Sequence, residues 1–296
     1  MFEELSEQKA FLEDYRIPQE RFAKAMVSWG ILSAIANDYL IHYDDFKCIA
    51  ERFIEKFYGC MDVHASNYRI KDVNHLIEKV IRKNPKRSKD GVCITVENYK
   101  QEITDIIGIR LVLLYKRQWK NVHDFIIENY GDSLHEDPFA YVSSGDDLTD
   151  YKEKDVRHIL SKDGYRSVHY VIKENEYRVE IQVRTLAEEV WGEIDHNIRY
   201  PYKINNPILG QYMSLMAALS SSIDNMATFL CTHINRFDDS QCGKTENEVY
   251  NEILSEIEKI EGNKEIKDRL RTIIMNTDEY QKIIDPLSLI DIISKE

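Results

Sequence analysis

Several kinds of residue and segment are scarce in this chain of 296 residues, and each scarcity excludes a class of protein. The five cysteines are scattered and form no C-x-x-C pair, which argues against a disulfide framework or a structural zinc site. No apolar run approaches the length of a membrane span, and the first twenty residues lack the basic start and apolar run of a signal peptide. We therefore expect a soluble, cytoplasmic protein with reduced thiols.

Basic charge is also in the minority, since the formal net charge is -13. That balance disfavours broad binding to nucleic acid or anionic lipid. Residues 66–90 reverse the sign, with eight basic and three acidic side chains. Lysines and arginines at three- and four-residue spacing could form a solvated helix face. The functional alternative is a clamp for a polyphosphate, whose oxygens match guanidinium and ammonium groups.

The chain is organised around residues 177–185, where apolar and polar side chains alternate strictly. This alternation predicts a half-buried strand with Glu180, Gln182 and Arg184 on one face. Thr185 and Glu188 then form a capping box that opens a helix. The polar row therefore ends at a strand-to-helix corner, where α/β proteins usually place ligands.

Periodicity predicts further elements on both sides of this strand. A helix over 18–43, interrupted or softened at Gly30, precedes a second helix over 46–57. The later expectations are a loop over 84–96, a buried strand over 106–115, a helix over 116–130, a strand over 165–173, and helices after Pro207 and over 245–260 and 264–284. The apolar seam after Pro207 is too long for one small sheet to cover, so we expect part of it to pack on another helix or subunit.

These elements predict an α/β (α+β) chain in three parts. Residues 1–60 would form an N-terminal helical cover, residues 61–204 the domain that contains the strands, and residues 205–296 a C-terminal helical segment for interaction or oligomerisation. From residue 204 onward there are nine basic and sixteen acidic residues, which adds to the acidic character of that segment.

Four motifs occur in a fixed order along residues 69–185, the last of them followed by Trp191 and by Asp195-His196. They are Arg69-Ile-Lys71, Asp105-Ile-Ile-Gly-Ile-Arg110, Gly164-Tyr-Arg-Ser-Val-His169 and Glu180-Ile-Gln-Val-Arg-Thr185. Together they resemble the synthetase domain of the RelA/SpoT family, in the form of a small alarmone synthetase without hydrolase or TGS/ACT regions. The resemblance implies a nucleotidyltransferase-like mixed β-sheet flanked by helices, here with helical N- and C-terminal extensions.

The resemblance also implies an activity, that of a GTP diphosphokinase. Such an enzyme makes (p)ppGpp by transferring the β,γ-pyrophosphate of ATP to the 3′-hydroxyl of GDP or GTP, and it releases AMP. Asp105 and Glu180 match the catalytic carboxylates that hold Mg²⁺, and Glu180 is also the candidate general base. The matched ATP-binding residues are Arg69, Lys71, Lys79, Arg82 and Arg110, with Arg69 and Arg110 stacking on adenine. The matched acceptor residues are Tyr165, His169, Gln182 and Arg184, with Tyr165 stacking on guanine.

Two positions depart from the family pattern. Glu189 stands where small synthetases often place an asparagine that contacts guanine, and Arg199-Tyr-Pro-Tyr-Lys203 has a proline within the usual tyrosine and lysine ending. One alternative is a toxin-like member that pyrophosphorylates the 3′ end of tRNA, against which the acidic C-terminal segment argues. A second is a non-catalytic nucleotide-binding regulator. We expect ATP and GDP or GTP as partners, a homo-oligomer formed through the C-terminal helices, and no membrane.

Overall fold

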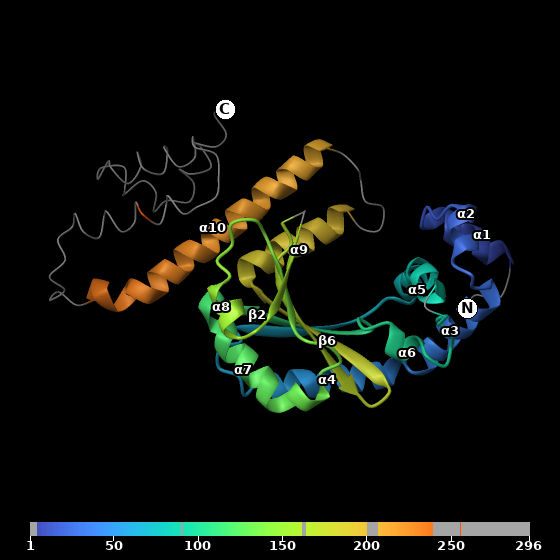
Figure 1. The fold of residues 1–296 in the computed structure, drawn as a ribbon, viewed down its shortest axis with the longest axis horizontal. Helices are drawn as coiled ribbons and strands as arrows, with labels where there is room; N and C mark the ends of the chain where they lie inside the picture. Colours follow the sequence, from blue (N-terminus) through green and yellow to red (C-terminus); the bar gives the residue numbers. More distant parts are fainter. Residues whose placement is uncertain (1–4, 90, 162–163, 200–206, 239–254, 256–296) are drawn as a thin grey trace. The chain divides into compact units, whose positions relative to one another are not determined.

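The computed structural model describes residues 5–89, 91–161, 164–199, 207–238 and 255. The chain divides into two compact units, residues 1–213 and 214–296. The first unit holds a six-stranded sheet in the order β1-β2-β6-β5-β3-β4 (Figure 1). The expected mixed sheet flanked by helices is confirmed, whereas the division into three parts stays a prediction.

The sheet combines parallel and antiparallel neighbours. β2 runs parallel to β6 and β3 runs parallel to β4, while the other pairs are antiparallel. The strands expected over 106–115 and 165–173 are confirmed as β2 and β5, with ends shifted by one or two residues, and the strand expected over 177–185 is confirmed as β6 with the same ends. The six strands are β1 (Ala65–Ile70), β2 (Ile107–Leu113), β3 (Phe139–Val142), β4 (Arg157–Leu160), β5 (Ser167–Glu174) and β6 (Tyr177–Thr185).

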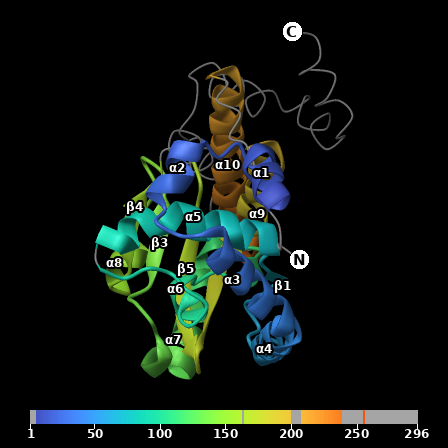
Figure 2. The same cartoon turned by 90° about the vertical axis from the view of Figure 1, so that its right-hand side faces the viewer.

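Helices cover both faces of this sheet. In Figures 1 and 2, α4 and α7 lie on one side of the sheet and α9 on the other. A short 3₁₀ turn, Lys116–Gln118, leads into α7, and another, Gly131–Ser133, follows it. The helices are α1 (Leu5–Asp14), α2 (Gln19–Lys24), α3 (Trp29–Ile41), α4 (Tyr43–Phe57), α5 (Val73–Lys89), α6 (Tyr99–Glu102), α7 (Trp119–Tyr130), α8 (Thr149–Glu153), α9 (Leu186–Arg199) and α10 (Pro207–Asp238).

The two faces of the central strands differ in chemistry. Ile109 of β2, Ile181 of β6 and Tyr170 of β5 are fully buried in the hydrophobic core, which also includes Phe46 and Phe57 of α4. Because side chains alternate along a strand, the opposite face carries the polar residues of the same strands. Because the core occupies one face of the sheet, the polar side chains that could form a functional site lie on the opposite face.

Two expectations about helices are wrong. The break in the segment 18–43 lies before Gly30, at residues 25–28, because Ser28 caps α3 by accepting a hydrogen bond of 3.3 Å from the backbone N–H of Ile31. The loop expected over 84–96 begins later, because α5 continues through Pro85 to Lys89.

Asn84 explains why α5 is held in place beyond the predicted end. Its side chain is fully buried, donates to the carbonyl of Ala25 at 2.9 Å and accepts from the N–H of Ile94 at 2.8 Å. The Asn84 side chain thereby satisfies the carbonyl of Ala25 and the N–H of Ile94, both of which lie outside helices and strands. A contact with residues so distant in sequence leaves no local pattern.

The helix expected after Pro207 is confirmed as α10, and the helices expected over 245–260 and 264–284 lie outside the described residues. Along α10, Leu219, Ile223, Met226 and Leu230 are exposed at steps of three and four. In the described part of the chain, every helix is too short or too polar to cross a bilayer.

The Asn84→Ala variant tests the clamp on α5. It should lower the free energy of unfolding by about 2–6 kcal/mol, because one buried carbonyl and one buried N–H would each lose a partner at about 1–3 kcal/mol. Denaturant titration measures the loss. Lys86→Ala, at an exposed position of the same helix, is the control and should change stability by less than about 0.5 kcal/mol. Equal losses in the two variants would contradict the role of Asn84.

Candidate active site

Polar side chains of neighbouring strands meet on the face opposite the core. The parallel register of β2 and β6 places Gly108 beside Glu180 and Arg110 beside Gln182. The antiparallel register of β5 and β6 places His169 beside Gln182. Residues opposite each other in register share a face, so the motifs that are far apart in sequence form one surface.

Asp105 lies just before β2 and is paired with two lysines. Lys71 Nζ is 2.9 Å and Lys79 Nζ is 2.7 Å from its Oδ2 atom, and all three side chains are at least three-quarters buried. Burial alone would raise the pKa of Asp105, but the two ammonium groups outweigh burial and lower the pKa to about 2. The carboxylate is therefore ionised at any neutral pH.

Glu180 accepts hydrogen bonds on both carboxylate oxygens. Oε1 lies 3.2 Å from His169 Nδ1, and Oε2 accepts from Gln182 Nε2 at 2.6 Å. Burial raises the pKa of Glu180, as does the negative charge of Asp105. Hydrogen bonding and charge from His169, together with the hydrogen bond from Gln182, outweigh both effects, so the pKa of Glu180 lies below its usual value.

His169 connects Glu180 to Tyr165. Its ring is buried, stacks on Phe139 at 5.2 Å, and places Nε2 3.0 Å from the Tyr165 hydroxyl. Because an ionised carboxylate only accepts, Nδ1 must donate to Glu180, and in the neutral ring Nε2 then accepts from Tyr165. The hydroxyl oxygen of Tyr165 accepts in turn from Arg184 Nη2 at 2.6 Å. All donors in this chain of hydrogen bonds point the same way.

Arg184 is the most enclosed cation of the site, with a side chain 8% exposed. Its Nη2 atom also donates to Gln182 Oε1 at 2.7 Å, and its guanidinium carbon lies 5.0 Å from the centre of the Tyr165 ring. Burial alone would lower the pKa of Arg184, but Tyr165 and Glu189 raise it above its usual value. The guanidinium is thus held as a fixed charge.

Arg110 is tied to α9 by two carboxylates. Its Nη1 atom donates to Glu189 Oε1 at 2.9 Å and also to Glu193 Oε1. Glu189 uses its other oxygen, Oε2, to accept from Arg184 Nη1 at 2.9 Å. Sequence reasoning noted Glu189 only as a departure and missed Glu193. Their four-residue spacing on one helix face is the signal that could have paired them.

Gly192, between these two glutamates, permits the close approach of α9 to β6. A Cβ atom at this position would lie 2.8 Å from Arg184 Nη1. Arg184 is buried and held by three hydrogen bonds, so it has little freedom to move away. The packing therefore requires glycine here, although glycine weakens the middle of a helix.

Of the remaining residues predicted to bind ATP, Arg69 lies on the sheet and Arg82 lies on the exposed side of α5. Arg69 lies half-buried on β1, opposite Gly108. Burial lowers the pKa of both Lys71 and His196, and the positive charge of Arg69 adds to this effect. Arg82 is exposed and forms an ion pair of 3.1 Å with Glu78 of its own helix. The lysines and Arg69 thus lie near Asp105, whereas Arg82 pairs elsewhere in the structure.

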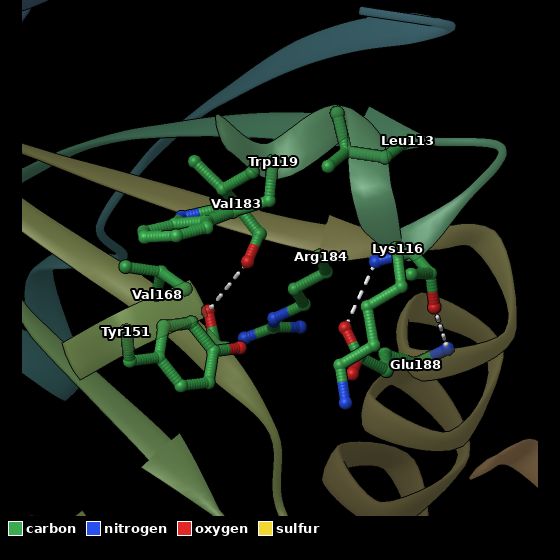
Figure 3. A pocket seen from close by; sticks show the side chains of 10 residues that line it. Leu113, Lys116, Trp119, Tyr151, Val168, Val183, Arg184 and Glu188 are labelled. Atoms are coloured by element: carbon green, nitrogen blue, oxygen red, sulfur yellow. Dashed lines mark hydrogen bonds between the residues drawn. The ribbon is translucent and has the colours of Figure 1, made fainter. Parts of the chain in front are cut away.

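A small cavity lies next to Arg184, where β2 and β6 end and α7, α8 and α9 approach one another (Figure 3). Its volume of about 20 Å³ has room for about one water. The Nε atom of Arg184 is buried and has no hydrogen-bond partner within the described residues. The cavity is too small for a nucleotide.

Asp105 and Glu180 suit a magnesium ion shared with a substrate. Oδ1 of Asp105 is buried without a hydrogen-bond partner in the described residues, which leaves one carboxylate oxygen for a ligand. No cluster of three or more His, Cys, Asp or Glu side chains able to hold a metal occurs in that part of the chain. Phosphates and water would have to complete the coordination, as they commonly do for Mg²⁺.

Comparison with known proteins finds a matching family model and two similar proteins of the same named activity. Residues 68–205 match the family model described as "Region found in RelA / SpoT proteins". The chain is 26% identical over 171 residues to GTP pyrophosphokinase YwaC of Bacillus subtilis (strain 168), a match that covers 55% of this chain and 69% of YwaC. It is 27% identical over 147 residues to GTP pyrophosphokinase YjbM of the same organism, covering 47% of this chain and 57% of YjbM.

A solved structure supports the fold. The structure of a GTP pyrophosphokinase family protein from Streptococcus pneumoniae superposes with a TM-score of 0.50 at 19% identity, covering 67% of this chain and 95% of that chain. Carboxylates together with lysines and arginines are the kinds of side chain that phosphoryl-transfer enzymes use. The RelA/SpoT region expected from the motifs is thus matched over residues 68–205. The roles of its individual residues stay predictions.

The Asp105→Asn variant tests the pairing with the two lysines. The folded pKa of about 2 lies below the ordinary value of 3.8, so ionised Asp105 stabilises the folded state above about pH 4 and loses this effect as the pH falls through 2. The wild type should be about 2 kcal/mol more stable than the variant near pH 6, at about 1.4 kcal/mol per pKa unit, and the difference should shrink below pH 4.

Denaturant titration in magnesium-free buffer measures this difference at each pH where both proteins fold. Asp124→Asn, which removes an exposed partner of Lys154, is the control and should cost less than about 1 kcal/mol. A difference for Asp105→Asn that does not change with pH would contradict the pairing.

Proposed function

We propose that this chain is a GTP pyrophosphokinase that transfers the β,γ-pyrophosphate of ATP to the 3′-hydroxyl of GDP or GTP and releases AMP. The observation that carries the proposal is the position of Glu180, an ionised carboxylate held by His169 and Gln182 on the polar face of a RelA/SpoT region. The relatives YwaC and YjbM, both named GTP pyrophosphokinases, support it.

On the donor side, basic residues would bind ATP. Lys71 and Lys79 would exchange their contact with Asp105 for contacts with the triphosphate, because ammonium groups pair readily with phosphate oxygens. Arg69 and Arg110 would stack on adenine with their flat guanidinium faces. Arg82, exposed on α5, would have to leave Glu78 to reach the same phosphates.

On the acceptor side, Tyr165 would stack on guanine, and Gln182, Arg184 and His169 would line the same subsite. Glu180 would accept the proton of the 3′-hydroxyl as the new bond forms between that oxygen and the β-phosphorus of ATP. The bond between the β-phosphorus and the oxygen that bridges it to the α-phosphorus breaks, and AMP leaves. His169 and Gln182 hold the two oxygens of Glu180, which fixes the base in one orientation.

Asp105 and Glu180 would hold Mg²⁺, which supplies charge neutralisation for the transferred phosphates when bound. Charge and hydrogen-bond donors already in place are the main means by which proteins promote phosphoryl transfer. Lys71 and Lys79 would contribute such charge directly, and their ion pairs with Asp105 support this role.

We further propose that the protein acts in the cytoplasm as a homo-oligomer. The exposed apolar row of α10, Leu219, Ile223, Met226 and Leu230, supports an interface on the second unit. Residues 1–60 would be a helical cover for the catalytic domain of residues 61–204, and residues 205–296 would be the segment for oligomerisation.

The purified protein with ATP carrying label in its β- or γ-phosphate tests the function. With Mg²⁺ and GDP or GTP, we expect AMP and a labelled guanosine nucleotide that carries a 3′-pyrophosphate. Transfer of label only to tRNA would indicate the toxin-like activity instead. Absence of AMP with every acceptor would indicate a non-catalytic nucleotide-binding protein.

The Glu180→Gln variant tests the base. The substitution keeps the size of the side chain but removes its charge, so turnover should fall by at least about a thousandfold, which corresponds to about 4 kcal/mol of lost transition-state stabilisation. Circular dichroism and thermal unfolding check that the variant is folded. A folded Glu180→Gln protein with near-normal turnover would refute the assignment.

A further inference from the structure

The carboxylate of Glu189 lies between two arginines from neighbouring strands. Oε1 accepts from Arg110 Nη1 of β2, and Oε2 accepts from Arg184 Nη1 of β6, both at 2.9 Å. The side chain of Glu189 is 16% exposed, that of Arg110 is 21% exposed and that of Arg184 is 8% exposed. A carboxylate this enclosed interacts strongly with both guanidinium groups, because little solvent screens the charges.

Glu193, one helical turn further along α9, differs from Glu189 in a useful way. It accepts a hydrogen bond from Arg110, and its side chain is 45% exposed. Among the described residues, the carboxylate that pairs with Arg184 is that of Glu189. The two glutamates therefore share one arginine, and Glu189 alone of the pair also holds the second.

Arg184, whose carboxylate partner among the described residues is Glu189, organises the part of the site around Tyr165 and Gln182. Arg184 donates through Nη2 to the Tyr165 hydroxyl and to Gln182 Oε1, and its guanidinium lies over the Tyr165 ring. Tyr165 and Gln182 are in turn linked to Glu180, directly or through His169. A shift of Glu189 would therefore reach the base through side chains that are all in contact.

We propose that Glu189 is a positioning residue that couples the two nucleotide subsites, by holding Arg110 on the donor side and Arg184 on the acceptor side with one carboxylate. The inference rests on the proposed function, which assigns those two arginines to ATP and to the acceptor. Binding of ATP at Arg110 fixes one oxygen of Glu189, and the other oxygen then holds Arg184 and Tyr165 in the arrangement that receives the guanosine nucleotide.

The amide that Glu189→Gln introduces cannot hold both arginines. An amide offers one acceptor oxygen, and its NH₂ group would face a guanidinium that only donates. One of the two arginines must lose its contact with residue 189, whichever way the amide turns. Glu193→Gln leaves Glu189 in place, so it disturbs Arg110 alone.

Separate titrations of the full-length protein with a non-hydrolysable ATP analogue and with GDP test the coupling. Glu189→Gln should weaken binding of both nucleotides by about tenfold, whereas Glu193→Gln should weaken the ATP analogue and leave GDP within about twofold. In the wild type, saturating ATP analogue should tighten GDP binding by about fivefold or more, the lower end of ordinary coupling between sites. Glu193→Gln should keep this effect and Glu189→Gln should lose it.

Thermal unfolding accompanies each titration, because a buried arginine without its partner destabilises a fold. If Glu189→Gln does not fold, Glu189→Asp replaces it. Aspartate keeps the charge, but it is one methylene shorter and cannot span both contacts, so the coupling should still disappear. Equal behaviour of the variants at positions 189 and 193, or full coupling in a folded variant at position 189, would overturn the inference.

The proposed function fails in a different way. A wild type that forms no AMP and binds neither nucleotide refutes the pyrophosphokinase assignment, and this inference with it, before any variant is compared. A wild type that makes product and binds both nucleotides without mutual effect refutes the coupling alone. The two failures are therefore told apart by the wild-type measurements.

Discussion

The removal of charged side chains from water on one face of the sheet is the constraint on which the rest of this site depends. A buried ion costs on the order of several kcal/mol unless opposite charges and hydrogen bonds replace its hydration. Asp105 meets two ammonium groups, and Arg184 meets three oxygen acceptors. The charges of the site are thus paired before a nucleotide arrives. Under the proposed function, substrate binding would be an exchange of partners, in which phosphates and bases replace contacts that already exist.

The parts of the fold that the sequence predicts well are those encoded by neighbouring residues. β6 follows from alternation, and the turn into α9 follows from the capping box, in which Thr185 N–H donates to Glu188 Oε2 and Glu188 N–H donates to Thr185 Oγ1. One of the wrong expectations, the early end of α5, depends on a distant contact. The end of α5 is held through Asn84 by Ala25, 59 residues earlier, and no local signal reveals that bond.

In the candidate site too, some residues could be predicted from local sequence and others depend on tertiary contacts. The motifs locate Asp105, Glu180 and Arg184, because each lies at a strand end or on the polar side of a strand. Their partners come from tertiary structure: Glu189 and Glu193 approach Arg110 only because α9 folds back over β2 and β6. His169 shows a further limit. Its place on the polar face is predictable from alternation, but its burial between Tyr165 and Glu180 depends on packing against Phe139.

Gly192 has a consequence for attempts to engineer this protein. Replacing glycine in the middle of a helix with alanine is a standard route to a more heat-resistant protein, since alanine favours the helix by about 1 kcal/mol. Here the added carbon would lie 2.8 Å from a guanidinium nitrogen of Arg184. Design rules that score each helix by itself would choose this substitution, and they would trade an ordered active site for a more regular helix.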